Sequence, residues 1–249
     1  MGEPAEIEVR GLSIGYRGRA VQRDLAFSVR KGEVFVVMGD SGCGKSTLLR
    51  QMVGLDPPMA GDVLYSGEAY WAADEDRREQ IQARLGVLFQ QGALLSSLTL
   101  EENVSLALSE RAGLRPAEAQ AVARLKLALV GLAGFERHYP GEISGGMKKR
   151  AGLARAIALD PEILYFDEPS AGLDPLSARR LDDLILELRD ALGATVVLVT
   201  HELASIFALG DNAVFLDAER KTMTAQGKPE ELRESGDPKL RAFLNRGRQ

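Results

Sequence analysis

A glycine-rich stretch, "GDSGCGKST", has the residue types that hold a phosphate group. Glycines let several backbone N–H groups converge on an anion, and the N-terminus of a following helix adds a favourable dipole. In the P-loop pattern Gly-x-x-x-x-Gly-Lys-Ser, the lysine reaches the β- and γ-phosphates of a nucleotide and the serine hydroxyl binds Mg²⁺. We therefore predict a nucleotide-binding loop made of Gly39, Asp40, Ser41, Gly42, Cys43, Gly44, Lys45, Ser46 and Thr47.

Two adjacent carboxylates, Asp167 and Glu168, follow the apolar run "ILYF". Side chains of neighbouring residues at a strand end can diverge, so we predict that Asp167 helps to hold Mg²⁺ while Glu168 faces the attacking water. A general base must come within hydrogen-bond reach of that water, and Glu168 is the candidate. The alternative is an ordinary acidic strand-to-loop transition, but the presence of the P-loop favours the catalytic interpretation.

Two further residues are candidates for the nucleotide site, although their sequence signals are less specific. His201 follows another apolar run, and from there it can bind the γ-phosphate or orient the water. Tyr16 in "SIGYRG" can stack on adenine, because base–aromatic stacking positions a base. Taken alone, each has a plainer explanation, as a structural histidine and a surface tyrosine. His138 has no comparable neighbours and is expected to be structural.

A second small-residue helix start, "ISGGMKKR", lies about a hundred residues after the first. Ser144, Gly145 and Gly146 precede the alanine-rich stretch "MKKRAGLARAIALD", which predicts a helix whose N-terminal amides are exposed. We therefore predict a second phosphate-binding site at this helix N-terminus. The first loop already serves one nucleotide, so the second site has no obvious ligand within its own chain.

The elements that must position these residues follow from three short apolar runs, Val34–Met38, Ile163–Phe166 and Thr195–Val199. Such runs are typical of strands buried on both faces of a parallel sheet. Each is followed by one of the polar groups described above. Because ligands of open α/β sheets bind at the carboxyl ends of strands, we expect the groups to share a site.

The remaining pattern predicts an α/β fold of the P-loop NTPase class, with a mixed or parallel sheet as its core. The first thirty residues alternate like half-exposed strands, which indicates an antiparallel β layer beside the main sheet. From Gln91 to Asp160 the pattern is helical, with a capping box at Thr99 and Glu102. We predict one domain, 1–249, in which 1–90 and 161–249 form a RecA-like core and 91–160 an inserted α-helical subdomain.

Composition limits the partners and the compartment. The net charge of −5 gives no reason to expect nucleic acid as a partner. The single cysteine, Cys43, excludes an intramolecular disulfide framework and fits a reducing compartment. No signal peptide or apolar run long enough for a membrane helix is visible. We therefore expect a cytoplasmic chain whose membrane role, if it has one, depends on a partner.

Taken together, these motifs make the chain resemble the nucleotide-binding subunit of an ABC transporter over nearly its whole length. In that family Gly39–Thr47 is Walker A, Ser144–Met147 the signature, Ile163–Asp167 with Glu168 Walker B, and His201 the switch. The resemblance adds Gln90 in "LFQQGALL" as the Q-loop residue, with catalytic and metal-binding roles, and Asp174 in "AGLD" as the D-loop residue. Tyr16 matches the aromatic A-loop position.

The resemblance implies an ATPase that uses ATP and Mg²⁺ and works as a head-to-tail dimer. Each signature would cap the γ-phosphate held by the other copy's Walker A, which gives the second helix start its ligand. Integral-membrane permease subunits would turn closure and opening into transport. The chain would then lie on the cytoplasmic face of the inner membrane.

One residue differs from the usual ABC signature motif and indicates a subgroup of the family. The usual signature glutamine is replaced by Met147, which cannot complete a capping box with Ser144. "SGGM" followed by Lys-Lys-Arg resembles the ATPases of Mla- and MCE-type phospholipid transporters, as do "LFQQGALLSSLTLEENV" and "GDPKLRAFLNRG". That resemblance implies an MCE-domain lipid-binding protein and a STAS-domain protein as further partners. The plainer interpretation is a solvated basic helix turn with a neutral Met. Because the sequence stops at Gln249, we expect no long C-terminal extension that embraces the neighbouring subunit.

Three alternatives remain open from sequence alone. The first is an ABC transporter ATPase for an amino acid, peptide or metal complex, since the motifs do not choose the substrate. The second is a non-transport ABC ATPase, which usually has a long coiled-coil insertion or two fused cassettes; neither pattern occurs here. The third is a plain P-loop kinase, which leaves the second helix start unexplained.

Overall fold

The computed structural model describes residues 5–16, 18–90 and 92–246. It consists of two compact units, one of residues 1–82 with 195–249 and one of residues 83–194. The first unit therefore combines both ends of the chain, while the second is a continuous segment.

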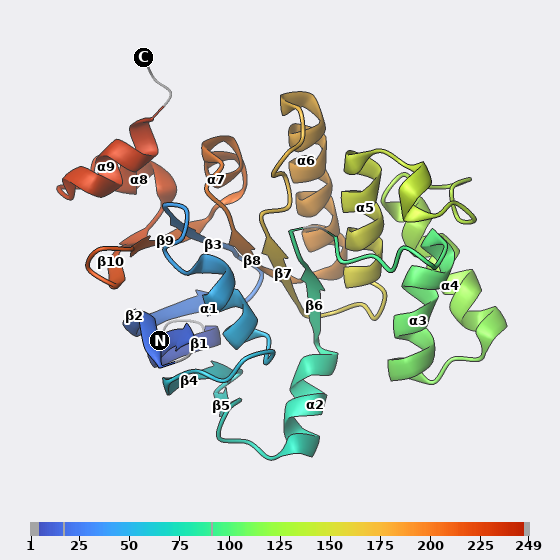
Figure 1. Ribbon diagram of the computed structural model, residues 1–249, viewed down its shortest axis with the longest axis horizontal. Coiled ribbons are helices and arrows are strands. Elements are labelled where there is room, and N and C mark those ends of the chain that lie inside the picture. The colour runs from blue at the N-terminus through green and yellow to red at the C-terminus, as the bar shows by residue number, and fades with distance from the viewer. Residues whose placement is uncertain (1–4, 17, 91, 247–249) are drawn as a thin grey trace. The chain divides into compact units, whose positions relative to one another are not determined.

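The first unit contains two β-sheets with short helices (Figure 1). Its elements, with α2 ending at the unit boundary, are β1 (Ala5–Tyr16), β2 (Arg19–Arg30), β3 (Val34–Gly39), α1 (Lys45–Met52), β4 (Ala60–Tyr65), β5 (Glu68–Ala69), α2 (Glu75–Ala83), β8 (Thr195–Val199), α7 (Leu203–Leu209), β9 (Asn212–Asp217), β10 (Thr222–Gly227), α8 (Pro229–Arg233) and α9 (Pro238–Asn245).

One sheet of this unit is antiparallel and has the strand order β2-β1-β4-β5. In β2, the buried Leu25, Phe27 and Val29 alternate with exposed neighbours. Period-two alternation buries one face of a strand and leaves the other solvated. The N-terminal antiparallel layer predicted from the sequence is confirmed.

The other sheet of the unit is mixed, with the order β10-β9-β3-β8. β3 is parallel to β8 and to β9, and β10 is antiparallel to β9. Every residue of β3 and of β8 is buried, as their uninterrupted apolar sequences require. The predicted strands at Val34–Met38 and Thr195–Val199 are confirmed.

Aromatic contacts tie the two layers of the first unit together. The ring of Phe27 in the antiparallel layer stacks on that of Phe35 in β3, with centroids 5.1 Å apart. The hydroxyl of Tyr65 donates a hydrogen bond to the Met52 carbonyl at the end of α1, at 2.6 Å. The core therefore lies between the layers and fixes the position of α1.

The C-terminal helices belong to this unit and pack on β9. The Phe243 ring of α9 meets the edge of Phe215 in β9 at 5.2 Å between centroids. Asp237 caps α9 by accepting hydrogen bonds from the N–H groups of Lys239 and Leu240. The chain after Lys228 thus forms two short helices, α8 and α9.

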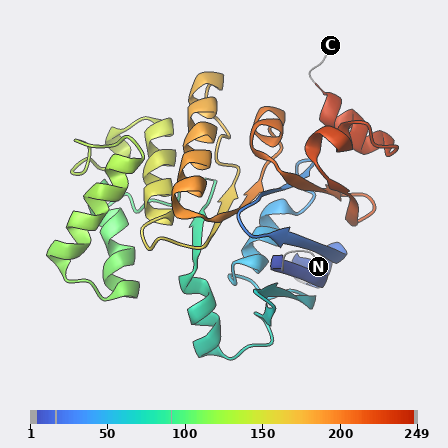
Figure 2. The same cartoon turned by 180° about the vertical axis from the view of Figure 1, so that it is seen from behind.

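The second unit is mainly helical and includes one parallel strand pair, β6 with β7. Figures 1 and 2 both show α3 and α4 side by side. Its elements are β6 (Leu85–Leu88), α3 (Leu100–Ala112), α4 (Pro116–Leu129), the 3-10 helix η1 (Pro140–Glu142), α5 (Gly145–Ala156), β7 (Ile163–Asp167) and α6 (Pro175–Leu192).

Local signals start and end these helices as expected. The Thr99 hydroxyl accepts a hydrogen bond from the Glu102 N–H at 3.2 Å, and the Glu102 carboxylate accepts one from the Thr99 N–H at 2.7 Å. This is the predicted capping box. Pro116 occupies the first turn of α4, and Gly193 ends α6 with φ +62°.

The α/β fold class with a mixed sheet is confirmed, while the internal boundaries remain a prediction. The predicted subdomain 91–160 contains α3, α4 and α5, and the second unit also takes in β6, β7 and α6. Two residues that bound predicted features lie outside the described residues: Gln91, the first residue of the predicted subdomain, and Gln249. Among the described residues, no helix has both the length and the apolar character required to cross a membrane.

Candidate nucleotide-binding site

The predicted P-loop connects buried β3 to α1 through a turn that only glycine accommodates at two positions. A Cβ on Gly39 would lie 2.6 Å from the Leu216 carbonyl oxygen and 2.7 Å from the Cys43 sulfur. A Cβ on Gly44 would lie 2.6 Å from Val21, and φ there is +102°. The backbone therefore turns tightly into α1, whose first-turn N–H groups the helix itself does not pair.

Lys45 is buried and lies across this loop. Its Nζ donates hydrogen bonds to the Gly39 carbonyl at 2.9 Å and to the Asp40 carbonyl at 3.2 Å. The ammonium group is therefore held at the loop by the same chain that supplies the glycines. A cation fixed among main-chain amides is the arrangement that binds the terminal phosphates of a nucleotide.

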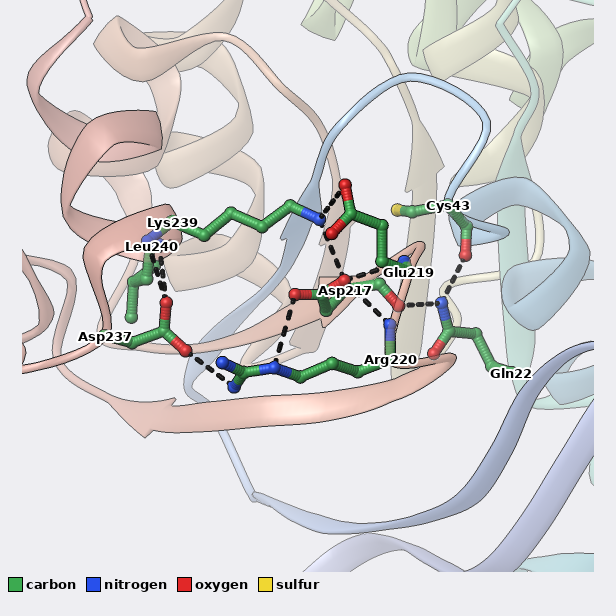
Figure 3. Close-up of polar contacts among 8 residues, drawn as sticks. All are labelled: Gln22, Cys43, Asp217, Glu219, Arg220, Asp237, Lys239 and Leu240. Atoms are coloured by element: carbon green, nitrogen blue, oxygen red, sulfur yellow. Dashed lines mark hydrogen bonds and ion pairs between the residues drawn. The ribbon is translucent and has the colours of Figure 1, made fainter.

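A buried glutamine supports the loop from β2. Gln22 Nε2 donates to the Cys43 carbonyl at 2.7 Å and to the Asp217 carbonyl at 3.1 Å (Figure 3). Burial raises the pKa of the Cys43 thiol, which makes it a neutral packing residue at neutral pH. The loop is therefore attached to the antiparallel layer and to the end of β9.

Tyr16 lies beside the helix that follows the loop. It is the last residue of β1, pairs with Arg19 across the hairpin and is 63% exposed. Together with Thr47, Arg50 and Met59 it borders a pocket of about 650 Å³. An exposed aromatic ring beside the phosphate loop is placed to stack on a nucleotide base.

His201 lies near the same edge of the sheet as the loop. β3 and β8 are parallel with Val37 opposite Val199, so the chain leaves both strands in the same direction. The Thr200 N–H donates to the Val37 carbonyl at 3.2 Å. The His201 carbonyl accepts a hydrogen bond from Arg246 Nη2 at 2.5 Å, so the end of α9 contacts the residue predicted to be the switch.

The predicted Walker B carboxylates and Gln90 lie together in the second unit. Leu88 of β6 pairs with Phe166 of β7 in parallel, so Gln90 and Asp167 follow neighbouring strands at one edge. Asp167 and Glu168 are both buried at 6% exposure. Glu168 has φ +49°, a left-handed conformation that costs a residue other than glycine roughly 1–3 kcal/mol.

Lys149 of α5 joins the two strand ends. Its Nζ donates hydrogen bonds to the main-chain carbonyls of Gln90 and Glu168, the latter at 3.2 Å. Burial lowers the pKa of Lys149, and the charges of Asp167 and Glu168 act against that shift. The interpretation of "MKKR" as an entirely solvated turn is wrong, because Lys149 is only 8% exposed.

The second helix start has the predicted geometry. Ser144 is the N-cap of α5, and its hydroxyl accepts a hydrogen bond from the Met147 N–H at 3.3 Å. Met147 returns no side-chain bond, so the capping box present at Thr99 is incomplete here. Ser144 and Gly145 are exposed, which leaves the helix N-terminus open to an anion.

Asp174 faces the same pocket as this helix start. It is the N-cap of α6, and its carboxylate accepts hydrogen bonds from the N–H groups of Leu176 at 3.1 Å and Ser177 at 3.0 Å. The bonds from Ser177 hold the pKa of this exposed carboxyl below its usual value. Ser144, Gly146 and Asp174 line one pocket of about 800 Å³ within the second unit.

The predicted residues thus fall into two groups. The first unit holds Tyr16, the loop Gly39–Thr47 and His201, and the second holds Gln90, Ser144 to Gly146, Asp167, Glu168 and Asp174. Within each unit, residues far apart in sequence are brought to one strand edge or one pocket. Their individual roles remain predictions.

Sequence reasoning missed three supporting residues, Gln22, Lys149 and Arg246. Each donates a hydrogen bond to the main-chain carbonyl of a predicted site residue. Lys149 gave a weak signal, because a lysine on the inward face of a helix must find acceptors. Gln22 gave no such signal, because the polar residues Arg23 and Asp24 follow it and nothing in the local sequence marks it as buried.

Comparison with known proteins identifies the family of this site. The family model described as ABC transporter matches residues 22–171. Mkl of Mycobacterium tuberculosis strain H37Rv, a probable ribonucleotide transport ATP-binding protein, is 40% identical over 239 residues, which cover 96% of this chain and 66% of Mkl. MlaF of Escherichia coli strain K12, an intermembrane phospholipid transport ATP-binding protein, is 37% identical, with 96% and 88% covered.

A solved structure gives the same result. The dimeric post-hydrolysis state of the ATP-binding cassette MJ0796, bound to ADP and Pi, superposes with a TM-score of 0.81 at 28% identity, over 89% of this chain and 98% of that one. This chain belongs to the ABC transporter family and has the fold of its ATP-binding cassettes. The family and fold class inferred from the motifs are confirmed.

Proposed function

We propose that this chain is the ATP-binding and ATP-hydrolysing subunit of an ABC transporter that moves phospholipid between bacterial membranes. The observation that carries the proposal is the presence in one chain of two helix N-termini preceded by small residues, an arrangement that can bind an anion. One has the buried Lys45 beside it, and the other is the Ser144-capped tip of α5 in a pocket with Asp174. A cassette that shares its nucleotide with a second copy needs both.

The residues divide the work on one ATP molecule. Tyr16 stacks on the adenine, while the loop amides and Lys45 bind the β- and γ-phosphates. Glu168 accepts the proton of the attacking water, for which a carboxylate held at the end of a buried strand is suited. His201 contacts the γ-phosphate or orients the water.

The donor groups present fit Mg²⁺. Ser46 offers a hydroxyl, Asp167 a carboxylate and Gln90 an amide oxygen, and Mg²⁺ prefers oxygen ligands, with most sites left to water and phosphate. Among the described residues there is no group of three or more His, Cys, Asp and Glu side chains that could hold a metal ion alone. A site completed by the nucleotide needs no such group. When bound, the ion neutralises charge on the phosphates.

The partner that completes the site is a second copy of the chain, packed head to tail. Ser144, Gly145 and Gly146 would then cap the γ-phosphate bound by the partner's loop, and Asp174 would lie at the same boundary. The dimeric state of the similar MJ0796 cassette supports this arrangement. Water is excluded when the two copies close, which strengthens the electrostatic interactions with the phosphates.

The membrane component is an integral-membrane permease, with this chain on the cytoplasmic face of the inner membrane. The name of MlaF and the "SGGM" signature support phospholipid as the substrate class. An MCE-domain lipid-binding protein and a STAS-domain protein are the further partners we propose, on the motif resemblance to Mla-type systems.

A second candidate substrate has its own support. Mkl, at 40% identity, is named for ribonucleotide transport, although this chain spans only 66% of its length. The cassette chemistry would be unchanged, because substrate is selected by the membrane subunits. An amino acid, peptide or metal complex remains the wider alternative.

The test is hydrolysis coupled to a transported molecule. The chain would be purified through an affinity tag with its co-expressed permease and reconstituted in proteoliposomes, with a Glu168→Gln complex as the control. We expect MgATP-dependent hydrolysis and ATP-dependent transfer of a labelled phospholipid to acceptor vesicles. Transfer of a labelled ribonucleotide instead would establish the second candidate, and absence of hydrolysis would refute the ATPase assignment.

A further inference from the structure

Lys149 occupies an unusual place in the second unit. It lies in the second turn of α5, the helix whose N-terminus is Ser144, and is 8% exposed. A lysine is almost never this buried unless its ammonium group has fixed partners. Its hydrogen-bond partners are carbonyl oxygens of two other segments, the main chain at Gln90 and the main chain at Glu168.

The Glu168 main chain needs restraint. Its φ of +49° is rare for any residue but glycine, and such conformations persist only when their surroundings fix them. Two donors are bonded to its carbonyl oxygen, the Lys149 ammonium group and the Ala171 N–H, each at 3.2 Å. The Lys149 bond connects this peptide to α5.

The following turns of α5 are fixed to the same part of the chain, at Gly92 and Ala93. Arg155 donates hydrogen bonds to the Ala93 carbonyl at 2.7 Å and to the Gly92 carbonyl at 3.0 Å. A Cβ on Gly152 would lie 3.2 Å from the Gly92 main chain and 2.7 Å from Leu88, so the helix approaches this segment very closely. Lys149 is therefore supported by a helix that cannot easily move away.

We propose that Lys149 is a positioning residue for hydrolysis, which holds the left-handed main chain of Glu168 and thereby aims its carboxylate. The lysine lies five residues after Ser144 on the same helix. It therefore links the tip that meets the partner's nucleotide to the peptide that carries the base. Misplacing a reacting group by about 1 Å can cost about 100-fold in rate. This proposal rests on the proposed ATPase function.

The experiment compares substitutions at Lys149 with a matched control in the full-length protein. Lys149→Met keeps the length of the side chain and removes the donor, while Lys149→Arg and Lys149→Gln keep donors. Lys148→Met is the control on the neighbouring residue. We expect Lys149→Met to lower kcat for MgATP about 10- to 100-fold while KM changes by less than about threefold. Lys149→Arg or Lys149→Gln should recover at least part of the loss, and Lys148→Met should leave kcat unchanged.

A second measurement separates positioning from a general loss of structure. If Lys149 acts through Glu168, Lys149→Met should have little further effect on the single-turnover rate of Glu168→Gln, because the two changes remove one function. If Lys149→Met instead disrupted the structure in general, its effect on the rate would multiply with that of Glu168→Gln. If the Met variant does not fold, Lys149→Leu, which also removes the donor, takes its place in this comparison.

Three results would overturn the proposal: kcat of Lys149→Met within about twofold of wild type, a change confined to KM, or effects that multiply in the Glu168→Gln background. Failure of the proposed function has a different signature. It would appear as a wild-type protein that hydrolyses no ATP, whatever residue stands at position 149.

Discussion

The Nε2 atom of Gln22 donates a hydrogen bond to the main-chain carbonyl of Cys43 at 2.7 Å, within the phosphate loop (Figure 3). The same nitrogen donates to the Asp217 carbonyl at 3.1 Å. Gln22 is fully buried, and its Oε1 has no hydrogen-bond partner among the described residues. One amide therefore supports the loop while its own acceptor is left unsatisfied.

Gln22→Leu should consequently affect nucleotide binding more than stability. The change removes one donor from each of two carbonyls but also removes the unsatisfied oxygen, so the free energy of unfolding should fall by no more than about 1–2 kcal/mol. ATP binding should weaken by up to about tenfold, because the Cys43 peptide is less restrained. Urea denaturation and titration with a fluorescent ATP analogue measure the two effects. Arg23→Ala, at an exposed position of the same strand, is the control; equal losses in both variants would contradict the role of Gln22.

Glu168→Gln should separate binding from hydrolysis. The amide keeps the size of the side chain and cannot take a proton from water, so we expect kcat to fall at least about 100-fold while ATP affinity is retained. Without turnover, ATP should hold two copies together, and size-exclusion chromatography with MgATP should show a dimer. Glu162→Gln, at a 53% exposed carboxylate just before the same strand, should behave as wild type. Sustained hydrolysis by Glu168→Gln would show that another group is the base.

The link between α9 and β9 predicts a stability difference that depends on pH. Asp217 is 2% exposed and accepts hydrogen bonds from Lys239 Nζ at 2.9 Å and from the N–H groups of Glu219 and Arg220. Burial alone would raise the pKa of Asp217, but the bond from Lys239 and the main-chain donors outweigh it, so the pKa lies below the usual 3.8. A carboxyl of this kind stabilises the fold only while it is ionised, so its contribution is present above pH 3.8 and is lost as the pH falls through the lower folded-state pKa.

Asp217→Asn should therefore lower the free energy of unfolding at neutral pH, by about 1–3 kcal/mol for a hydrogen-bonded charge. The difference from wild type should shrink as the pH drops below 3.8. Urea midpoints at a series of pH values measure it. Glu219→Gln is the control, because Glu219 contacts the same lysine at 3.5 Å but is 85% exposed and should contribute little. A difference that grows on acidification would contradict the sign of the shift.

Much of the fold could be predicted because its signals are local. The uninterrupted apolar runs became β3, β7 and β8, and two glycines of the loop, Gly39 and Gly44, mark positions where a Cβ does not fit. The Thr99 and Glu102 capping box and the Ser144 N-cap are likewise set by residues three apart. The bonds from Gln22, Lys149 and Arg246 join residues 21, 19 and 45 positions apart, and no local pattern encodes such pairings.

The division of the chain into two units could not be predicted from the sequence pattern either. The helical stretch is visible from periodicity, but β6, β7 and α6 join the helices because of packing between distant segments. The left-handed backbone of Glu168 is a further case. A glutamate gives no sign of positive φ, since the conformation is imposed by its surroundings.

Lys45→Ala and Ser144→Arg should inactivate the protein in different ways. Lys45→Ala removes the cation that spans the loop and should weaken ATP binding itself by at least about tenfold. Ser144→Arg places a bulky charge at the tip of α5, so it should leave binding to the variant's own loop unchanged and abolish hydrolysis. Titration with a fluorescent ATP analogue and a phosphate-release assay distinguish the two. Equal loss of affinity in both variants would contradict the assignment of the two sites.

Hydrolysis by an equimolar mixture of the Lys45→Ala and Ser144→Arg proteins tests the shared site most directly. Each variant alone should be inactive. In a mixed dimer, one of the two sites combines the intact loop of one copy with the intact tip of the other. With random pairing and independent sites, the mixture should recover about a quarter of the wild-type rate, since half of the dimers are mixed and each has one complete site. A mixture as inactive as its components, or normal hydrolysis by the Ser144→Arg protein alone, would contradict a nucleotide site built from two copies.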